Sequence, residues 1–348
     1  MACYYPLRAF PIGQTSKGKV KYQIMSSKCD YVYHPEDKKK SILLARKITD
    51  FVEVPCGKCL GCRLDYSRQW ATRCILEAKK YQFNYVLTLT YDEDNIKIVD
   101  GVNLETGELA KVGTLVPEDL TKFMKDLRRY YEYHYGLTNI RFYACGEYGD
   151  VKNTHRPHFH VIVFNCPIFD LKEFFINAIG EKVYLSDTIA SIWKKGQISV
   201  IELSWESAAY VARYVMKKVK GKGAKEFYEK AGIVPEFVRM SRSRGIGYDY
   251  FNENKDHIYE CDEIIYKGKK CPQVVKPPKY FDKLYDLEEP EKMQKLKEVR
   301  RKVAEERMKL ELMQTDLPKR EYLKQKEANA FEKIKNLKRN RKVGSIGV

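Results

Sequence analysis

The chain has 348 residues, of which 44% are hydrophobic and 13% aromatic, so it can bury at least one sizeable core and is not an intrinsically disordered protein. Its 64 lysines and arginines against 47 aspartates and glutamates give a formal net charge of +17, which attracts polyanions such as nucleic acid or an anionic membrane. Because no segment approaches the ~20 apolar residues of a membrane span and the first residues lack the layout of a signal peptide, we expect a cytoplasmic protein.

Three cysteines lie close together near the end of residues 1–62, a loop-rich N-terminal segment. The stretch PCGKCLGCR places Cys56, Cys59 and Cys62 at two successive CxxC spacings. The ten cysteines are spread through a long chain without an export signal, so they suit thiols or metal ligands better than disulfides. We therefore predict a structural Zn²⁺ site here, with an iron–sulfur cluster and plain reduced thiols as alternatives. The candidates for a fourth ligand are Cys3, Cys29 and Cys74.

Residues 63–225 have the pattern of an α+β domain in which helices flank a mostly antiparallel central sheet. Helical periodicity predicts helices for residues 63–81, for the segment that follows Pro117, and for residues 185–196 and 204–223. Alternation predicts strands for residues 84–95, 140–149, 156–164 and 197–203, with a hairpin-like insert at residues 101–113. Because only a polar loop separates the second and third strands, we expect them to pair antiparallel in the middle of the sheet.

Two histidines in the third predicted strand form a candidate metal site. In RPHFHVIVF, His158 and His160 flank Phe159. Residues two apart in a strand point to the same face, so both imidazoles project together while Phe159 points into a core. Glu147 lies near the end of the strand that should pair with this one, which makes it the natural third ligand. The competing interpretation is a pair of surface or hydrogen-bonded histidines without a metal.

Two tyrosines in the last predicted helix form a candidate pair of nucleophiles. Tyr210 and Tyr214 are four residues apart in SAAYVARYVMKK, so on a helix they stand on one face, which Lys218 extends by another turn. A metal that neutralises phosphate oxygens and a phenol held in line provide what transesterification of a phosphodiester requires. Positive charge from the metal and from Lys217 or Lys218 would help to form the phenolate, and Lys217 is also a candidate DNA contact. The alternative is ordinary amphipathic packing of the two rings.

These motifs also resemble those of a known family. TLTY at residues 88–91, PHFHV at residues 157–161 and YVARYVMKK at residues 210–218 resemble the three ordered motifs of HUH endonucleases. The two-tyrosine helix with its trailing lysines is similar to that of the rolling-circle replication initiators of the Microviridae, of the gokushovirus type. The similarity covers residues 56–220 by motif order.

The resemblance implies an HUH endonuclease-like fold and a metal-dependent tyrosine endonuclease. His158, His160 and Glu147 would bind Mg²⁺ or Mn²⁺, and Tyr210 and Tyr214 would be the nucleophiles. Such an enzyme nicks phage origin DNA through a 5′-phosphotyrosine intermediate and religates it during rolling-circle replication. The tyrosines follow the histidines, which is the order in replication initiators, whereas conjugative relaxases carry their tyrosines first.

The expected partners are single-stranded DNA at the phage origin and a host helicase and polymerase, because the chain has no P-loop that would mark a motor of its own. No membrane is expected as a partner, and the expected location is the cytoplasm of the bacterial host. Three other functions stay open: a non-catalytic basic DNA-binding or packaging protein, a single-tyrosine transposase-like HUH nuclease, and a metal-dependent phosphodiesterase that uses water.

The rest of the chain offers further candidate DNA contacts. Arg156, directly before the histidine strand, is a candidate clamp for the DNA backbone. In residues 226–286, a basic and aromatic extension, the run RMSRSRGIGYDYF contains Arg242 and Arg244 and suits either a single DNA strand or an ordinary basic loop. Residues 287–348 form a charged tail that is predicted to be a solvated helix or partly disordered, or else an arm that binds DNA or a partner.

Overall fold

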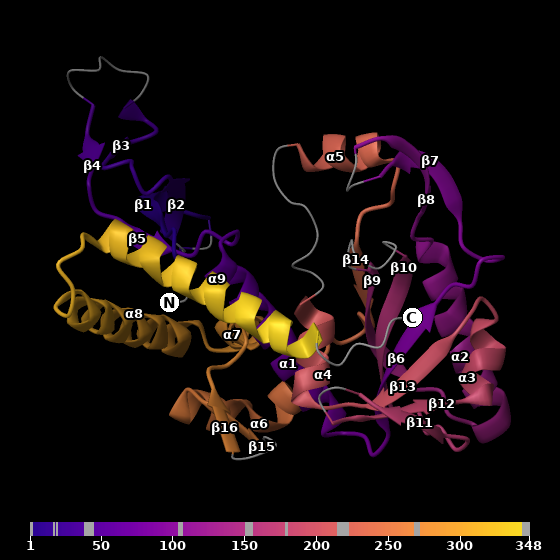
Figure 1. The fold of residues 1–348 in the computed structure, drawn as a ribbon. Coiled ribbons are helices and arrows are strands. Elements are labelled where there is room, and N and C mark those ends of the chain that lie inside the picture. Colours follow the sequence, from indigo (N-terminus) through magenta and orange to yellow (C-terminus); the bar gives the residue numbers. More distant parts are fainter. Residues whose placement is uncertain are drawn as a thin grey trace. The chain divides into compact units, whose positions relative to one another are not determined.

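The computed structural model describes residues 3–342 except residues 17, 19, 38–44, 104–106, 150–155, 178–179, 214–222 and 268–271. This described chain packs into two compact units (Figure 1). The larger unit is formed by Ser67–Met293, and the smaller unit by Met1–Tyr66 together with Gln294–Arg339. The cysteine-bearing N-terminal segment and most of the charged tail are far apart in the sequence but belong to the same unit.

The larger unit is built on a seven-stranded antiparallel sheet. Its strands are β6 (Asn84–Thr90), β9 (Arg141–Tyr148), β10 (Pro157–Phe164), β11 (Lys172–Ile176), β12 (Lys182–Leu185), β13 (Ile198–Glu202) and β14 (Phe237–Met240). Their order across the sheet is β11-β12-β13-β6-β10-β9-β14. The histidine strand β10 thus lies between β6 and β9 and pairs antiparallel with both. The predicted α+β class, with a mostly antiparallel sheet, is confirmed.

Helices and two hairpins complete the larger unit. The helices are α1 (Leu60–Ala78), which starts in the smaller unit, and α2 (Pro117–Tyr135), α3 (Asp187–Trp193), α4 (Trp205–Arg213), α5 (Ala224–Ala231), α6 (Tyr248–Cys261) and α7 (Lys279–Glu288). The hairpins are β7 (Ile98–Val102) with β8 (Leu109–Gly113), and β15 (Ile264–Lys267) with β16 (Pro272–Val275). The predicted hairpin-like insert is the first of these. The helix predicted for residues 204–223 is described as α4, and its continuation over residues 214–222 lies outside the described residues.

Alternation along the central strands separates two hydrophobic cores. Leu87 and Phe159 point to one face of the sheet, where they pack in a cluster with side chains of α2 and α3. Val86 and Ile162 point to the other face and pack with side chains of α1 and α4. Figure 1 shows these two helix pairs on opposite sides of the sheet. Because every second residue of β10 is buried against one helix pair, the strand is held in a single register.

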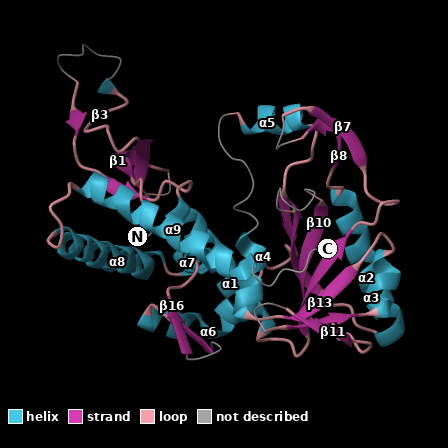
Figure 2. Cartoon of the chain, in the orientation of Figure 1, coloured by secondary structure: helices cyan, strands magenta, loops and turns pink. Residues whose placement is uncertain are grey.

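The smaller unit contains short strands where the sequence predicts a loop-rich segment (Figure 2). They are β1 (Leu7–Gln14), β2 (Val20–Met25) and β5 (Val52–Val54), which form one sheet in the order β2-β1-β5, and the paired β3 (Val32–Tyr33) and β4 (Lys47–Ile48). Most of their side chains are only partly buried, so these strands lack the clear alternation of buried and exposed residues by which strands are recognised.

Two long helices, α8 (Pro290–Leu312) and α9 (Lys319–Lys342), form the predicted charged helical tail. α9 is packed onto the rest of the smaller unit. Leu323 is buried, Lys319 forms an ion pair with Glu53 at 2.6 Å, and the carboxylate of Glu327 accepts a hydrogen bond from the Leu60 N–H at 3.1 Å. Neither these two helices nor any other described helix has an apolar stretch long enough to cross a membrane.

Candidate metal centre and nucleophile

Strand alternation places three candidate metal ligands on one face of the large sheet. His158 and His160 have the same parity as Ile162 in β10, so they point to the face covered by α1 and α4, away from Phe159. The register of β9 and β10 sets Glu147 directly opposite His158. Residues in that relation have Cβ atoms ~4.5–5.5 Å apart, which lets the carboxylate reach both imidazoles.

The ligand atoms of these residues converge. Glu147 Oε1 lies 2.8 Å from His158 Nε2 and 3.4 Å from His160 Nε2. One ligand atom from each of the three residues can be chosen so that all lie within 4.8 Å of one another. Only 2% of the Glu147 side chain is exposed, against 7% for His160 and 16% for His158. The carboxylate is therefore at the bottom of the group, and His158 is the ligand nearest to solvent.

A second contact orients each imidazole. His158 Nδ1 lies 3.1 Å from the backbone carbonyl oxygen of Arg156, and His160 Nδ1 lies 3.1 Å from Thr88 Oγ1. An imidazole whose Nδ1–H donates a hydrogen bond presents the lone pair of Nε2 to a metal. Both rings are thus held with Nε2 toward Glu147, as metal-binding histidines commonly are.

The electrostatics of the group suit a divalent cation. Burial by itself raises the pKa of Glu147, but hydrogen bonds from His158 and His160, together with their charge, lower this pKa to about 2. The carboxylate is therefore ionised at neutral pH. Two neutral imidazoles and one carboxylate leave open coordination positions on a metal of ordinary coordination number. We conclude that these residues fit a divalent metal.

Tyr210 of α4 stands beside the group. Its ring centroid lies 5.5 Å from that of His160, at an interplanar angle of 79°. The buried Ala208, Val211 and Ala212 seat α4 against the sheet, whereas 44% of Tyr210 is exposed. The phenol is thus placed next to the candidate metal ligands and remains accessible from outside. The other residues predicted for this helix, Tyr214, Lys217 and Lys218, lie outside the described residues.

Arg156 is held within the protein. Its guanidinium donates to the backbone carbonyl oxygen of Tyr91 at 3.0 Å and forms an ion pair with Glu93 at 2.5 Å. Its own carbonyl oxygen is the group that orients His158. These contacts give Arg156 a part in building the site, and its predicted contact with the DNA backbone stays a prediction.

Arg242 and Arg244 are exposed on the loop that follows β14. Arg141 fixes this loop by donating to the carbonyl oxygens of Ser243 at 2.7 Å and of Arg244 at 2.6 Å. Arg141 and Glu147 are six residues apart in β9, which corresponds to ~20 Å along a strand. The two arginines are therefore presented at the end of β9 away from the candidate metal ligands.

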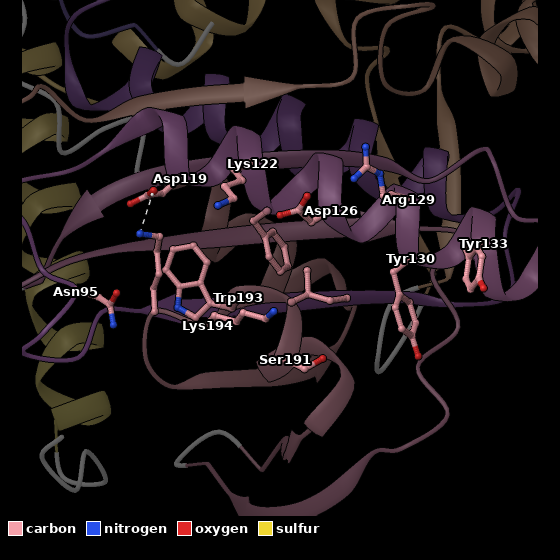
Figure 3. A pocket seen from close by; sticks show the side chains of 13 residues that line it. Asn95, Asp119, Lys122, Asp126, Arg129, Tyr130, Tyr133, Ser191, Trp193 and Lys194 are labelled. Carbon is pink, nitrogen blue, oxygen red and sulfur yellow. Dashed lines mark ion pairs between the residues drawn. The ribbon is translucent and has the colours of Figure 1, made fainter.

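A pocket of about 750 Å³ lies on the other face of the sheet, between α2 and α3 (Figure 3). Lys122 and Asp126 of α2 and Trp193 of α3 line it, and Asp119 forms an ion pair with Lys195 at 3.3 Å across it. Phe159 and Trp193 belong to the core on this face. The pocket is thus separated from His158 and His160 by the sheet itself.

The predicted cysteines of the smaller unit also come together. Cys56, Cys59 and Cys62 are joined by Cys3, one of the three candidates for a fourth ligand. The other two candidates lie apart from this group. Cys74 is fully buried in the core between α1 and the large sheet, and Cys29 contacts the carbonyl oxygen of Tyr31.

Sequence reasoning missed Thr88 as a part of the site. In TLTY, Thr88 and Thr90 alternate with the core residue Leu89, so they have the parity that points toward the histidines. Register places Thr88 directly opposite His160 and Thr90 directly opposite His158. Polar residues at alternate positions of an otherwise apolar central strand are the signal that could have identified Thr88.

We expect Thr88→Val to weaken metal binding by roughly 10–100-fold, because the substitution keeps the shape of the side chain but removes the acceptor that orients His160. Nicking measured against Mn²⁺ concentration should then require more metal for half-maximal rate and recover at high metal. Thr88→Ser, which keeps the hydroxyl, should behave like the wild type. An unchanged metal dependence in the valine variant would show that Thr88 does not position His160.

The chain is similar to replication-associated proteins of phages. The family model of the replication-associated protein ORF2 matches residues 84–219. Replication-associated protein ORF2 of Spiroplasma virus 4 is 36% identical over 307 residues, which cover 87% of each chain. Replication-associated protein VP4 of Bdellovibrio phage phiMH2K is 29% identical over 253 residues, 72% of each chain, and replication-associated protein ORF4 of Chlamydia phage 1 is 32% identical over 236 residues, 66% of this chain and 53% of the phage protein. No solved structure matches the chain significantly.

The matched region extends from the first strand of the central sheet through the two histidines to the tyrosine pair. The identity to the Spiroplasma virus protein extends over most of both chains, beyond this region. The expected relationship to replication proteins of the Microviridae is confirmed. The chain belongs to the family of the phage replication-associated protein ORF2.

Proposed function

We propose that this protein initiates phage replication by nicking single-stranded origin DNA, with a tyrosine as the nucleophile and a divalent metal as cofactor. The observation that carries the proposal is the position of Tyr210, whose ring lies 5.5 Å from that of His160 at the edge of the converging group of Glu147, His158 and His160. Membership in a family of phage replication-associated proteins supports the same function. We further propose an HUH endonuclease-like fold for the larger unit.

The metal is proposed to be Mn²⁺ or Mg²⁺. His158, His160 and Glu147 would hold it, and when bound it would neutralise charge on the oxygens of the scissile phosphate. Two imidazoles are softer donors than Mg²⁺ usually takes, so Mn²⁺ is the better first choice for experiments. Thr88 and the carbonyl oxygen of Arg156 keep the two rings in the orientation that this binding requires.

In the proposed reaction, the phenolic oxygen of Tyr210 attacks the phosphorus of the scissile phosphodiester. The new P–O bond to tyrosine forms as the bond to the 3′ oxygen breaks, and the phenolic proton is lost while the 3′ oxygen gains one. The products are a 5′-phosphotyrosine and a free 3′ hydroxyl. Tyr214 is the proposed second nucleophile, and Lys218 or Lys217 would favour the phenolate by its charge.

DNA binding is proposed to rest mainly on contacts between basic side chains and phosphates. The net charge of +17 favours such binding, and Arg242 and Arg244 are exposed on a loop whose backbone is fixed by Arg141. We propose single-stranded origin DNA and a host helicase and polymerase as partners, and the cytoplasm of the bacterial host as the place of action.

The proposal predicts a covalent protein–DNA adduct of defined polarity. The full-length protein would be incubated with Mn²⁺ and single-stranded oligonucleotides that tile the genome encoding it, each labelled at the 5′ or the 3′ end. On a denaturing gel, the 3′ label should migrate with the protein, because the downstream fragment is the one joined to tyrosine. The 5′-labelled fragment should be released with a free 3′ hydroxyl.

The other outcomes would contradict the proposal. Cleavage without an adduct would favour a phosphodiesterase that uses water. Binding of every oligonucleotide without cleavage at any Mn²⁺ or Mg²⁺ concentration would favour a DNA-binding or packaging protein. An adduct that carries the 5′ label would reverse the polarity of the cut.

A further inference from the structure

We propose that Cys3, Cys56, Cys59 and Cys62 bind one Zn²⁺ ion in a closed, purely structural site in the smaller unit. This site is separate from the proposed nicking chemistry, which lies in the larger unit. The four sulfur atoms all lie within 4.8 Å of one another, and Cys3 Sγ is 3.9 Å from Cys59 Sγ. The sequence alone left three candidates for the fourth ligand, and the fold brings Cys3 to the CxxCxxC stretch across more than fifty residues of chain.

The sulfur spacing matches a single tetrahedral ion. With Zn–S bonds of about 2.3 Å, the sulfurs of a tetrahedral site are about 3.8 Å apart. A disulfide requires a sulfur–sulfur distance of about 2.0 Å, well below the separation of Cys3 and Cys59. An iron–sulfur cluster binds its thiolates through different iron atoms, which separates the sulfurs by more than one ion does. The observed group therefore fits one metal ion better than either alternative.

The surrounding backbone is arranged to stabilise thiolates. Several backbone N–H groups point at the sulfurs, and N–H groups that donate to an anionic acceptor favour its charged form. Cys59 directly precedes α1 and Cys62 lies in its first turn, where the partial positive charge of the helix N-terminus acts in the same direction. The donors are Tyr4 N and Cys62 N to Cys59 Sγ (3.4 and 3.5 Å), Cys56 N to Cys3 Sγ (3.2 Å), and Cys59 N and Lys58 N to Cys56 Sγ (3.3 and 3.5 Å).

The site has the composition and the position of a structural zinc centre. Four thiolates complete a tetrahedral shell and leave no position for water or substrate, which distinguishes structural from catalytic zinc. Cys3 precedes β1, whereas the other three ligands lead into α1, so one ion links both parts of the smaller unit. Glu327 of α9 accepts a hydrogen bond from Leu60 immediately beside the cysteines. Loss of the ion should therefore destabilise the smaller unit, including the attachment of α9.

Metal analysis of the full-length protein tests the proposal. The analysis should use the background variant Glu147→Gln/His158→Ala, so that zinc at the candidate nicking site does not add to the count. Protein produced with added zinc and purified without chelator should contain about one zinc per chain. The further substitution Cys59→Ser should remove this zinc, and Cys3→Ser should lose it to a chelator concentration that leaves the parent loaded. Cys29→Ser, a cysteine of the same unit outside the group, should keep it.

A measurement without cysteine substitutions guards against variants that fail to fold. Cobalt exchanged into the otherwise unaltered chain should give the intense visible and charge-transfer absorption of tetrahedral Co²⁺ bound by four thiolates. Absence of zinc, visible absorption of iron in its place, an octahedral cobalt spectrum, or zinc that survives both Cys3→Ser and Cys59→Ser would each overturn the proposal. Because none of these readouts depends on nicking, the zinc site and the proposed enzymatic function can fail separately.

Discussion

Replacing His158 or His160 with alanine is expected to reduce nicking of single-stranded origin DNA by roughly 10³-fold or more. Each substitution removes one of three ligands of the proposed metal, and charge stabilisation by such a metal contributes several kcal/mol to the transition state. DNA affinity should change little, because it is proposed to come mainly from phosphate contacts made elsewhere on the basic surface. Nicking rate and DNA affinity would be measured separately on the same preparations.

A matched histidine outside the site provides the control. His257 is exposed on α6, so His257→Ala makes the same chemical change without touching the group of Glu147, His158 and His160. This variant should nick like the wild type. The double variant His158→Ala/His160→Ala should also keep the salt dependence of DNA binding. If that double variant still nicked DNA, these histidines would not be the metal ligands of the reaction.

The tyrosine pair is expected to show a division of labour. Tyr210→Phe and Tyr214→Phe should each retain some first cleavage, whereas the double variant should be inactive. Both phenols are proposed to reach a phosphate held by the same residues, since residues four apart on a helix share a face. A circle can be released only by a second cleavage while the first 5′ end is still attached. Either single substitution should therefore impair circle release more than first cleavage.

Circle release can be measured without a polymerase, on a single-stranded substrate that carries two copies of the origin. The first tyrosine would cut one copy and the second tyrosine the other, and the released 3′ hydroxyl would attack the first phosphotyrosine to close the circle. The joining step exchanges one phosphoester for another of similar energy, so no ATP should be needed. Tyr133→Phe, on the 83% exposed Tyr133 of α2, is the control and should behave like the wild type. If one substitution removed all cleavage while the other changed neither step, the second tyrosine would be structural.

The sequence by itself determined much of the sheet and of the metal group. His158 and His160 flank Phe159, and a strand that buries Phe159 must turn both imidazoles to the opposite face. The prediction that the strand of Glu147 pairs with the histidine strand needed only the short polar loop between them, and the register sets Glu147 opposite His158. These features are local or follow from neighbouring elements, which is why periodicity and chain order suffice to predict them.

The tertiary structure decided the features that depend on residues far apart in the chain. Thr88 meets His160 through strand pairing across 72 positions, Cys3 meets Cys59 across 56, and Glu327 meets Leu60 across 267. Spacing along the sequence carries no signal for such contacts, because they arise when separate elements bury their apolar faces against one another. The position of Tyr210 beside His160 is of the same kind. Helical periodicity puts a tyrosine on a face of α4, and only the packing of α4 on the sheet determines what that face meets.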